Sequence, residues 1–139
     1  MTVQDGRGAW IHGPGMRFIE TVVQADAEHL VARIDRLAAD HPLAQMGRIG
    51  TAILIEYAAQ AAAAHAPFCG ISARKAYLAA IHAVEWDQDV LTDALLPLNI
   101  EVVLEGRTEA AVRYAFTARR AGEVWAGGRL TLAYVGGDA

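Results

Sequence analysis

Glu56 is a carboxylate in the middle of a segment whose other residues are nearly all small or apolar. The segment runs from Arg48 to Ala66 and is rich in alanine, the residue with the highest helix propensity. Burying an ionised carboxylate without a partner is costly. Glu56 is therefore expected to lie at an exposed edge of the helix, to meet hydrogen-bond donors, or to border a water-filled cleft. The first possibility is purely structural, and the last is what a catalytic site requires.

Two nearby features favour a catalytic site. His41 precedes the helical segment, so its imidazole can return to the same cleft, and Gly47 and Gly50 flank the expected helix start. Unpaired backbone N–H groups and the helix dipole favour negative charge there, and small residues let a ligand approach the backbone. A histidine, a carboxylate and a helix N-terminus are the groups needed to remove a proton next to a carbonyl and to expel a hydroxyl. Residues three or four positions apart lie on the same face of a helix. One face of this helix therefore carries Ala52, Glu56, Ala59, Gln60 and Ala63.

The elements that must position these groups are mostly strands. Aromatic, β-branched and alternating patterns predict strands over 16–23, 29–35, 75–86, 98–105, 108–119 and 123–135. Turn residues at 26–28 and 120–123 predict two hairpins. The segments 37–46 and 87–94 are predicted to be loops. Pro67 and Gly70 are expected to end the helix.

One helix that is apolar on every side must be buried on most of them. Strands joined by consecutive hairpins form an antiparallel sheet. Alanine is too weakly apolar for a membrane span, and Glu56, Gln60 and His65 interrupt the run. We therefore predict one α+β domain over residues 1–139, in which a curved antiparallel sheet wraps around one long central helix. This architecture is the hotdog fold.

Composition excludes several classes of protein. The 139 residues are 54% hydrophobic and 20% charged, which is typical of a globular protein. A net charge of −4 gives no general attraction to nucleic acid or to an anionic membrane. The single cysteine excludes an internal disulfide, and the N-terminus lacks the pattern of a signal peptide, so a cytoplasmic location is expected. No metal-ligand spacing or phosphate loop occurs, and we expect neither a metal nor a cofactor.

The other histidines and the cysteine compete poorly for a catalytic role. His12 precedes a strand and is expected at a turn or rim, whereas His29 and His82 are expected at surface or half-buried strand positions. His65 ends the helix, where a cation suits the dipole. Cys69 is expected to be a packed or idle thiol.

Two segments resemble those of a known family. The run Glu56-Tyr-Ala-Ala-Gln60 is similar to the Glu-x-x-Ala-Gln signature on the central helix of β-hydroxyacyl-acyl-carrier-protein dehydratases, which have the hotdog fold. The run from His12 to Glu20 resembles the opening His-Arg-x-Pro-Met-Leu-Leu-Ile-Asp of those proteins. The resemblance is closest to the predicted dehydratase branch of aryl polyene-type clusters. His41 falls where the family has its catalytic histidine, although the gap to Glu56 is one residue longer and a Pro-Gly pair before the helix is reduced to Gly50.

The resemblance implies a reaction and an assembly. His41 would act as base at C2 of a 3-hydroxyacyl thioester on acyl carrier protein, and Glu56 would handle the departing C3 hydroxyl. Backbone N–H groups at the helix start would hold the thioester oxygen. The binding residues are therefore expected to be Gly47, Arg48, Ile49 and Gly50, together with Gln60 of the helical signature. Members of the family form dimers by joining their sheets, with the histidine and the acid on different chains. A homodimer is therefore expected, and a higher oligomer remains open.

Two alternatives remain open from the sequence. A thioesterase of the same fold would use Glu56 to activate water, and it would hydrolyse a plain acyl thioester. A non-catalytic acyl-binding partner subunit would have lost the chemistry through its altered loop after His41.

Overall fold

The computed structural model describes residues 21–35, 49–70, 76–91 and 96–135, and the structural statements below concern these residues. Six strands form one antiparallel sheet in the order β1-β2-β6-β7-β8-β4, and two short strands, β3 and β5, pair separately. The strands are β1 (Thr21–Ala25), β2 (His29–Ile34), β3 (Ile49–Gly50), β4 (Ala76–Trp86), β5 (Val90–Leu91), β6 (Leu98–Arg107), β7 (Ala111–Arg120) and β8 (Glu123–Tyr134). Helix α1 (Ile53–His65) continues into a short 3₁₀ helix, η3 (Ala66–Cys69).

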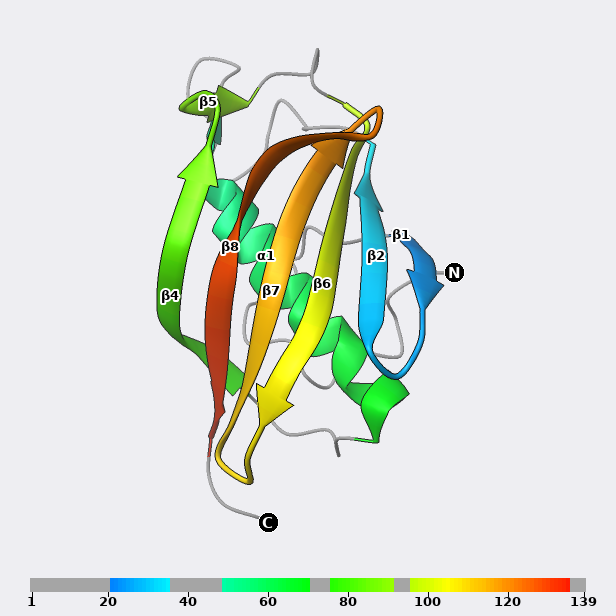
Figure 1. Cartoon of the computed structure of the whole chain (residues 1–139), viewed down its shortest axis with the longest axis vertical. Coiled ribbons are helices and arrows are strands. Elements are labelled where there is room, and N and C mark those ends of the chain that lie inside the picture. Colours follow the sequence, from blue (N-terminus) through cyan, green and yellow to red (C-terminus); the bar gives the residue numbers. More distant parts are fainter. Residues whose placement is uncertain (1–20, 36–48, 71–75, 92–95, 136–139) are drawn as a thin grey trace.

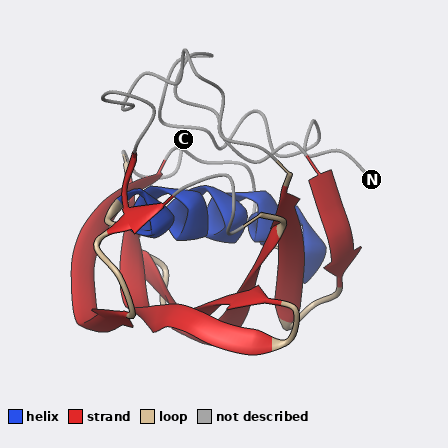
Figure 2. Ribbon diagram, turned by 90° about the horizontal axis from the view of Figure 1, so that it is seen from above, coloured by secondary structure: helices blue, strands red, loops and turns tan. Residues whose placement is uncertain are grey.

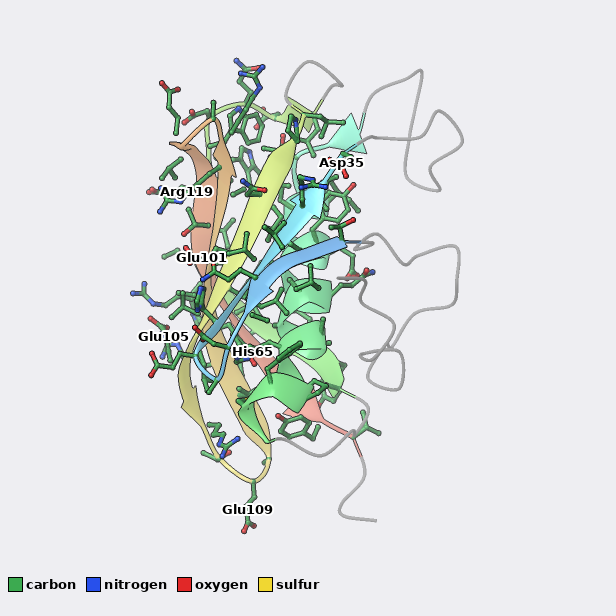
Figure 3. All side chains as sticks on the ribbon, turned by 90° about the vertical axis from the view of Figure 1, so that its right-hand side faces the viewer. Asp35, His65, Glu101, Glu105, Glu109 and Arg119 are labelled. Carbon is green, nitrogen blue, oxygen red and sulfur yellow. The ribbon has the colours of Figure 1, made fainter. Side chains whose placement is uncertain are left out.

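The sheet curves around α1, which lies along its concave side (Figures 1 and 2). Alternate residues of each central strand face the helix, as the two-residue period of a strand requires. On β6 these residues are Leu98, Ile100 and Val102, all fully buried, and β2, β7 and β8 contribute in the same way. The residues between them lie on the convex side, where Figure 3 shows Glu101, Glu105 and Arg119 pointing away from the helix.

Alanine fits α1 to this position. The side chains of Ala58, Ala61, Ala62 and Ala64 are buried within the core. Because these side chains are short, the helix can approach the sheet closely and still leave few voids. The helix is therefore enclosed on most sides, as its composition predicts.

Two hairpins have turns that match their local sequence. In the β1–β2 turn, the Asp26 carboxylate accepts hydrogen bonds from the amides of Glu28 and His29. In the β7–β8 turn, Ala121 and Gly122 both have positive φ, at 51° and 83°. Two consecutive residues of positive φ are the signature of a type I′ turn, whose twist suits a two-residue hairpin.

Strand β4 bulges where it passes β8. Its register with β8 shifts between His82 and Glu85, and Ala83 in the bulge has a φ of 52°. Val84 is thereby pressed against Gly128, where an added Cβ would lie 2.8 Å from Val84 Cγ2 and 3.0 Å from Val84 Cα. Gly128 is therefore required by a close approach of the β4 backbone.

The predicted elements are confirmed in type but not in every boundary. Both hairpins and the strands near 29–35, 75–86, 98–105, 108–119 and 123–135 are present. The helix begins at Ile53 instead of Arg48, because Ile49 and Gly50 pair with Leu91 and Val90 as β3 and β5. The predicted loop 87–94 therefore contains a strand. The predicted loop 37–46 and the first part of the strand predicted over 16–23 lie outside the described residues.

Candidate functional site

Glu56 lies in the first turn of α1, and its side chain is half-buried. A negative charge is favoured there by the helix dipole. Exposure varies along the helix face that carries Glu56: Ala52 is exposed and Ala63 is half-buried, whereas Ala59 and Gln60 between them are buried. The Glu56 side chain is therefore neither fully exposed nor buried in the core.

The helix start next to Glu56 presents backbone amides without a side-chain cap. Ala52 is the N-cap residue and makes no side-chain capping bond. The first hydrogen bonds at the helix start are made by the amides of Leu54 and Ile55. The Leu54 amide donates to the Thr51 carbonyl oxygen at 2.9 Å, and the Ile55 amide donates to the Ala52 carbonyl oxygen at 3.0 Å. The amides before them have no acceptor within a helix. Such a helix start favours an acceptor atom that carries negative charge.

Gly50 lies exposed in β3, just before this helix start. A Cβ added to Gly50 would meet no atom within 4 Å. Among the described residues, the space beside Gly50 is therefore open. Gly50 has no positive φ, so backbone conformation does not require a glycine here.

The structure brings some of the predicted site residues together. Gly50 and Glu56 lie at the same end of α1, and Gln60 follows one turn after Glu56 with only 2% of its surface exposed. The Ile49 backbone belongs to β3. His41, Gly47 and Arg48 lie outside the described residues, so the predicted pairing of His41 with Glu56 stays a prediction.

Thr51 is a residue of this region that the sequence reasoning missed. Its side chain is 1% exposed, and its hydroxyl donates to the carbonyl oxygen of Gln88, while its amide donates to the Asp89 carbonyl oxygen at 2.8 Å. A threonine directly before an apolar helical run is a common N-cap signal. Here that signal would have placed the helix start close to its true position.

His65 differs from its prediction as a helix-terminal cation. Its ring is fully buried, with Nδ1 2.7 Å from the Tyr114 hydroxyl and Nε2 2.7 Å from the Asp26 carbonyl oxygen. A carbonyl oxygen only accepts, so Nε2 carries the proton and Nδ1 accepts from Tyr114. Burial lowers the pKa of His65, which keeps the ring neutral, and the prediction of a cation is wrong because desolvation outweighs the dipole. Burial likewise raises the pKa of Tyr114, so its hydroxyl remains a donor.

His29, His82 and Cys69 lie at positions that agree with their predictions, whereas His12 lies outside the described residues. His29 is half-buried and bonded to Asp26, and His82 is exposed on β4. The Cys69 thiol is half-buried and lies 3.5 Å from the Ala66 carbonyl oxygen. None of these three residues is close to Glu56 in the sequence, and none belongs to the helix start.

A hollow of about 760 Å³ lies elsewhere, where β4 passes β8. Its lining includes Trp86, Trp125 and Arg129, and it contains none of the predicted site residues.

Within the described ranges, no group of three or more histidine, cysteine or acidic residues is arranged to hold a metal ion. In the same ranges, no helix is long and apolar enough to cross a membrane.

A family model described as ApeP dehydratase, ApeP-like, matches residues 9–134. The chain belongs to the ApeP-like dehydratase family. The predicted resemblance to hotdog dehydratases of aryl polyene-type clusters is thereby confirmed, and so is dehydration as the activity of the family. No curated protein matches the chain.

Solved structures confirm the hotdog fold for this ApeP-like chain. The dehydratase heterocomplex ApeI:P from Xenorhabdus doucetiae matches with a TM-score of 0.83 and 19% identity, over 99% of this chain and 93% of that chain. A thioesterase from Streptococcus pneumoniae, solved with coenzyme A, matches with a TM-score of 0.64 and 11% identity, over 86% and 88% of the two chains. AziG from S. sahachiroi matches with a TM-score of 0.64 and 17% identity, over 82% and 89%. At these identities the likeness concerns the fold alone.

Proposed function

We propose that this ApeP-like chain removes water from a 3-hydroxyacyl thioester carried on acyl carrier protein and releases the trans-2-enoyl thioester. The base takes the proton from C2, the C2–C3 double bond forms, and the C3 hydroxyl departs as water after accepting a proton. The observation that carries the proposal is the position of Glu56, half-buried in the first turn of a helix whose residues are mostly buried, in a chain of a dehydratase family.

We assign the roles as follows. His41 removes the C2 proton, and Glu56 delivers a proton to the departing hydroxyl. The amides at the helix start bind the thioester oxygen, on which negative charge develops as the C2 proton leaves. We assign binding of the thioester to Gly47, Arg48, Ile49 and Gly50, and also to Gln60, one turn after Glu56 on α1.

We further propose that the site is completed by a second hotdog chain, normally a second copy of this one. Among the described strands, β4 lies at an edge of the sheet, and an edge strand can pair with another chain. The similar Xenorhabdus doucetiae protein was solved as a heterocomplex, which supports an assembly of two hotdog chains. In such an assembly His41 of one protomer would meet Glu56 of its partner.

The products of the reaction distinguish a thioesterase from a dehydratase. The purified protein is incubated with a 3-hydroxyacyl thioester and with the matching plain acyl thioester on acyl carrier protein, and enoyl formation and free thiol are followed separately. We expect enoyl product from the first substrate and no thiol above background from either. Thiol release from both substrates without enoyl formation would establish the thioesterase. Binding without either product would establish the acyl-binding subunit.

The assigned pair is tested by substitution. We expect Glu56→Gln and His41→Ala each to lower dehydration by about 100-fold or more, because both groups move protons in one step. The double variant should be little worse than either single variant, since residues that act as a unit are not additive. Full activity of His41→Ala beside an inactive Glu56→Gln would contradict the paired mechanism.

A further inference from the structure

Thr51 forms three hydrogen bonds immediately before the helix start, and two of them lead away from the helix. Its hydroxyl donates to the Gln88 carbonyl oxygen and its amide donates to the Asp89 carbonyl oxygen, while its own carbonyl oxygen accepts the bond from Leu54. The hydroxyl does not cap the helix, because the N-cap is Ala52 and no side-chain capping bond is made. A buried hydroxyl that donates across 37 residues of sequence connects two elements.

The turn that receives Thr51 is itself fixed to the sheet. The Asp87 amide donates to the Trp125 carbonyl oxygen at 3.1 Å, and the Trp86 indole Nε1 donates to Asp89 Oδ1 at 2.9 Å. Strand β5 then pairs with β3, and its Leu91 is fully buried in the core. Figure 1 shows β5 beside the end of β4 and the start of α1. We call Thr51 together with residues 86–91 the helix-start clip.

The helix-start clip determines where the first amides of α1 point. Thr51 directly precedes Ala52, so each bond that fixes the Thr51 backbone also fixes the orientation of the amides that follow. Stabilising a developing negative charge requires donors held in place before the reaction, and a displacement of about 1 Å has a large effect on rate. Gly50, just before these amides, is exposed, and among the described residues no atom lies within 4 Å of a Cβ added there.

We infer that Thr51 is a positioning residue for the dehydration: its hydroxyl, held by the Gln88 carbonyl, aims the amides at the start of α1 toward the thioester oxygen. The inference rests on the proposed function. It adds a residue that touches no substrate atom and acts through the backbone that it holds. It also makes the end of edge strand β4 part of the support of the site, through Trp86.

Two substitutions at position 51 separate the hydroxyl from the shape of the side chain. Thr51→Val keeps the shape and removes the donor, and we expect kcat for enoyl formation to fall about 10-fold with a smaller change in KM. Thr51→Ser keeps the donor, and kcat should return to within about 2-fold of the original value. Trp86→Phe removes the indole N–H that donates to Asp89. This variant should also lower kcat, but by a smaller factor than Thr51→Val.

The control is Thr117→Val. Thr117 is half-buried on β7, pairs with Glu101 and Gly127 in register, and lies outside the clip. This variant should keep the original kcat. Urea unfolding of all variants shows what part of any activity loss comes from a lower folded fraction.

A spectroscopic measurement tests positioning without turnover. A saturated acyl thioester labelled with ¹³C at its carbonyl is bound to each variant, and the infrared carbonyl band is recorded. Aligned amides polarise the carbonyl and shift the band to lower frequency, and we expect Thr51→Val to lose most of that shift and Thr51→Ser to retain it. An unchanged band and an unchanged kcat in Thr51→Val would overturn the inference, as would failure of Thr51→Ser to restore them. If the unmodified protein forms no enoyl product, the proposed function fails, and the band still decides the inference about Thr51.

Discussion

Single residues at the bulge of β4 show how strictly the fold limits side-chain size. An added Cβ at Gly128 would also lie 3.2 Å from Phe116 Cε1, in addition to its contacts with Val84. Two of the three short distances involve the β4 residue, and one of them is to its backbone, which cannot rotate away. A methyl group at this position therefore has to displace the edge strand.

We predict that Gly128→Ala lowers the free energy of unfolding by about 1–3 kcal/mol, the usual cost of overpacking a core. The matched control is Gly106→Ala on β6, where an added Cβ meets no atom within 4 Å. The control should change stability by less than about 0.5 kcal/mol. Urea unfolding measures both. Equal stability of the two variants would contradict the close approach of β4 to β8.

Buried polar residues whose partners are distant in the sequence were the hardest to interpret from sequence. Glu56 was recognisable because a carboxylate is out of place in an alanine-rich helix. The role of Thr51 could not be recognised from the sequence, because its hydrogen-bond acceptor, the Gln88 carbonyl oxygen, lies 37 residues away in the chain. His65 was misread for a related reason: proximity to a helix end is visible in sequence, whereas burial against Tyr114 and the Asp26 carbonyl requires the sheet to be in place.

Among the elements, α1 is attached differently at its two ends. At its start the helix-start clip binds it to the segment after β4. At its end, His65 joins α1 to the β1–β2 hairpin through the Asp26 carbonyl oxygen and to β7 through the Tyr114 hydroxyl. Both attachments use polar groups that are buried and paired, which suits a helix that must keep one orientation inside an apolar core.

The attachment at His65 predicts a dependence of stability on pH. The folded-state pKa of His65 is lowered by burial, so the unfolded chain binds the proton more readily. Stability is therefore complete above the unfolded value of about 6.5 and decreases as pH falls from there toward the folded pKa. The loss cannot exceed about 1.4 kcal/mol per pH unit for one proton. The neighbouring Asp26 carboxyl, whose pKa is lowered from 3.8, does not titrate in this range.

We expect His65→Gln to be less stable than the original protein at pH 8 and to lose less stability between pH 6.5 and 5. The amide can still donate to Asp26 and accept from Tyr114, but it takes up no proton. His82→Gln, at an exposed position of β4, serves as control and should keep the original slope. Urea unfolding at several pH values measures these slopes, and an identical slope in His65→Gln would exclude His65 as the titrating group.

The elements also show where sequence patterns are sufficient. Alternation along β6, β7 and β8 predicted their positions well, because each strand has one face on the core and one on the convex side. The same reasoning failed for β3 and β5, since a two-residue strand is too short to have a period. The helix therefore begins later than predicted. Ile49 and Gly50 directly precede the helical segment in the sequence, but in the structure they pair with Leu91 and Val90 as a strand.

At the scale of the whole molecule, the sheet ends at β4 with a row of unpaired backbone groups on its outer side, within the part of the chain that the structure describes. An exposed edge strand is a template for pairing with another chain. On β4 the apolar side chains of Tyr77 and Ile81 are 51% and 44% exposed. These features agree with the proposed assembly of two hotdog chains through this edge.

We predict that Ile81→Lys converts the protein to monomers, because a charge would be buried in the joined sheet. The control is Val103→Lys, which changes a residue of similar exposure, 38%, on β6, a strand paired on both sides. Light scattering after size-exclusion chromatography gives the mass of each. If His41 and Glu56 of one site come from different chains, Ile81→Lys should also lose enoyl formation in proportion to the monomer fraction, and activity should return at high protein concentration. A monomer with full activity would show that each chain carries a complete site, and an unchanged dimer would place the interface elsewhere.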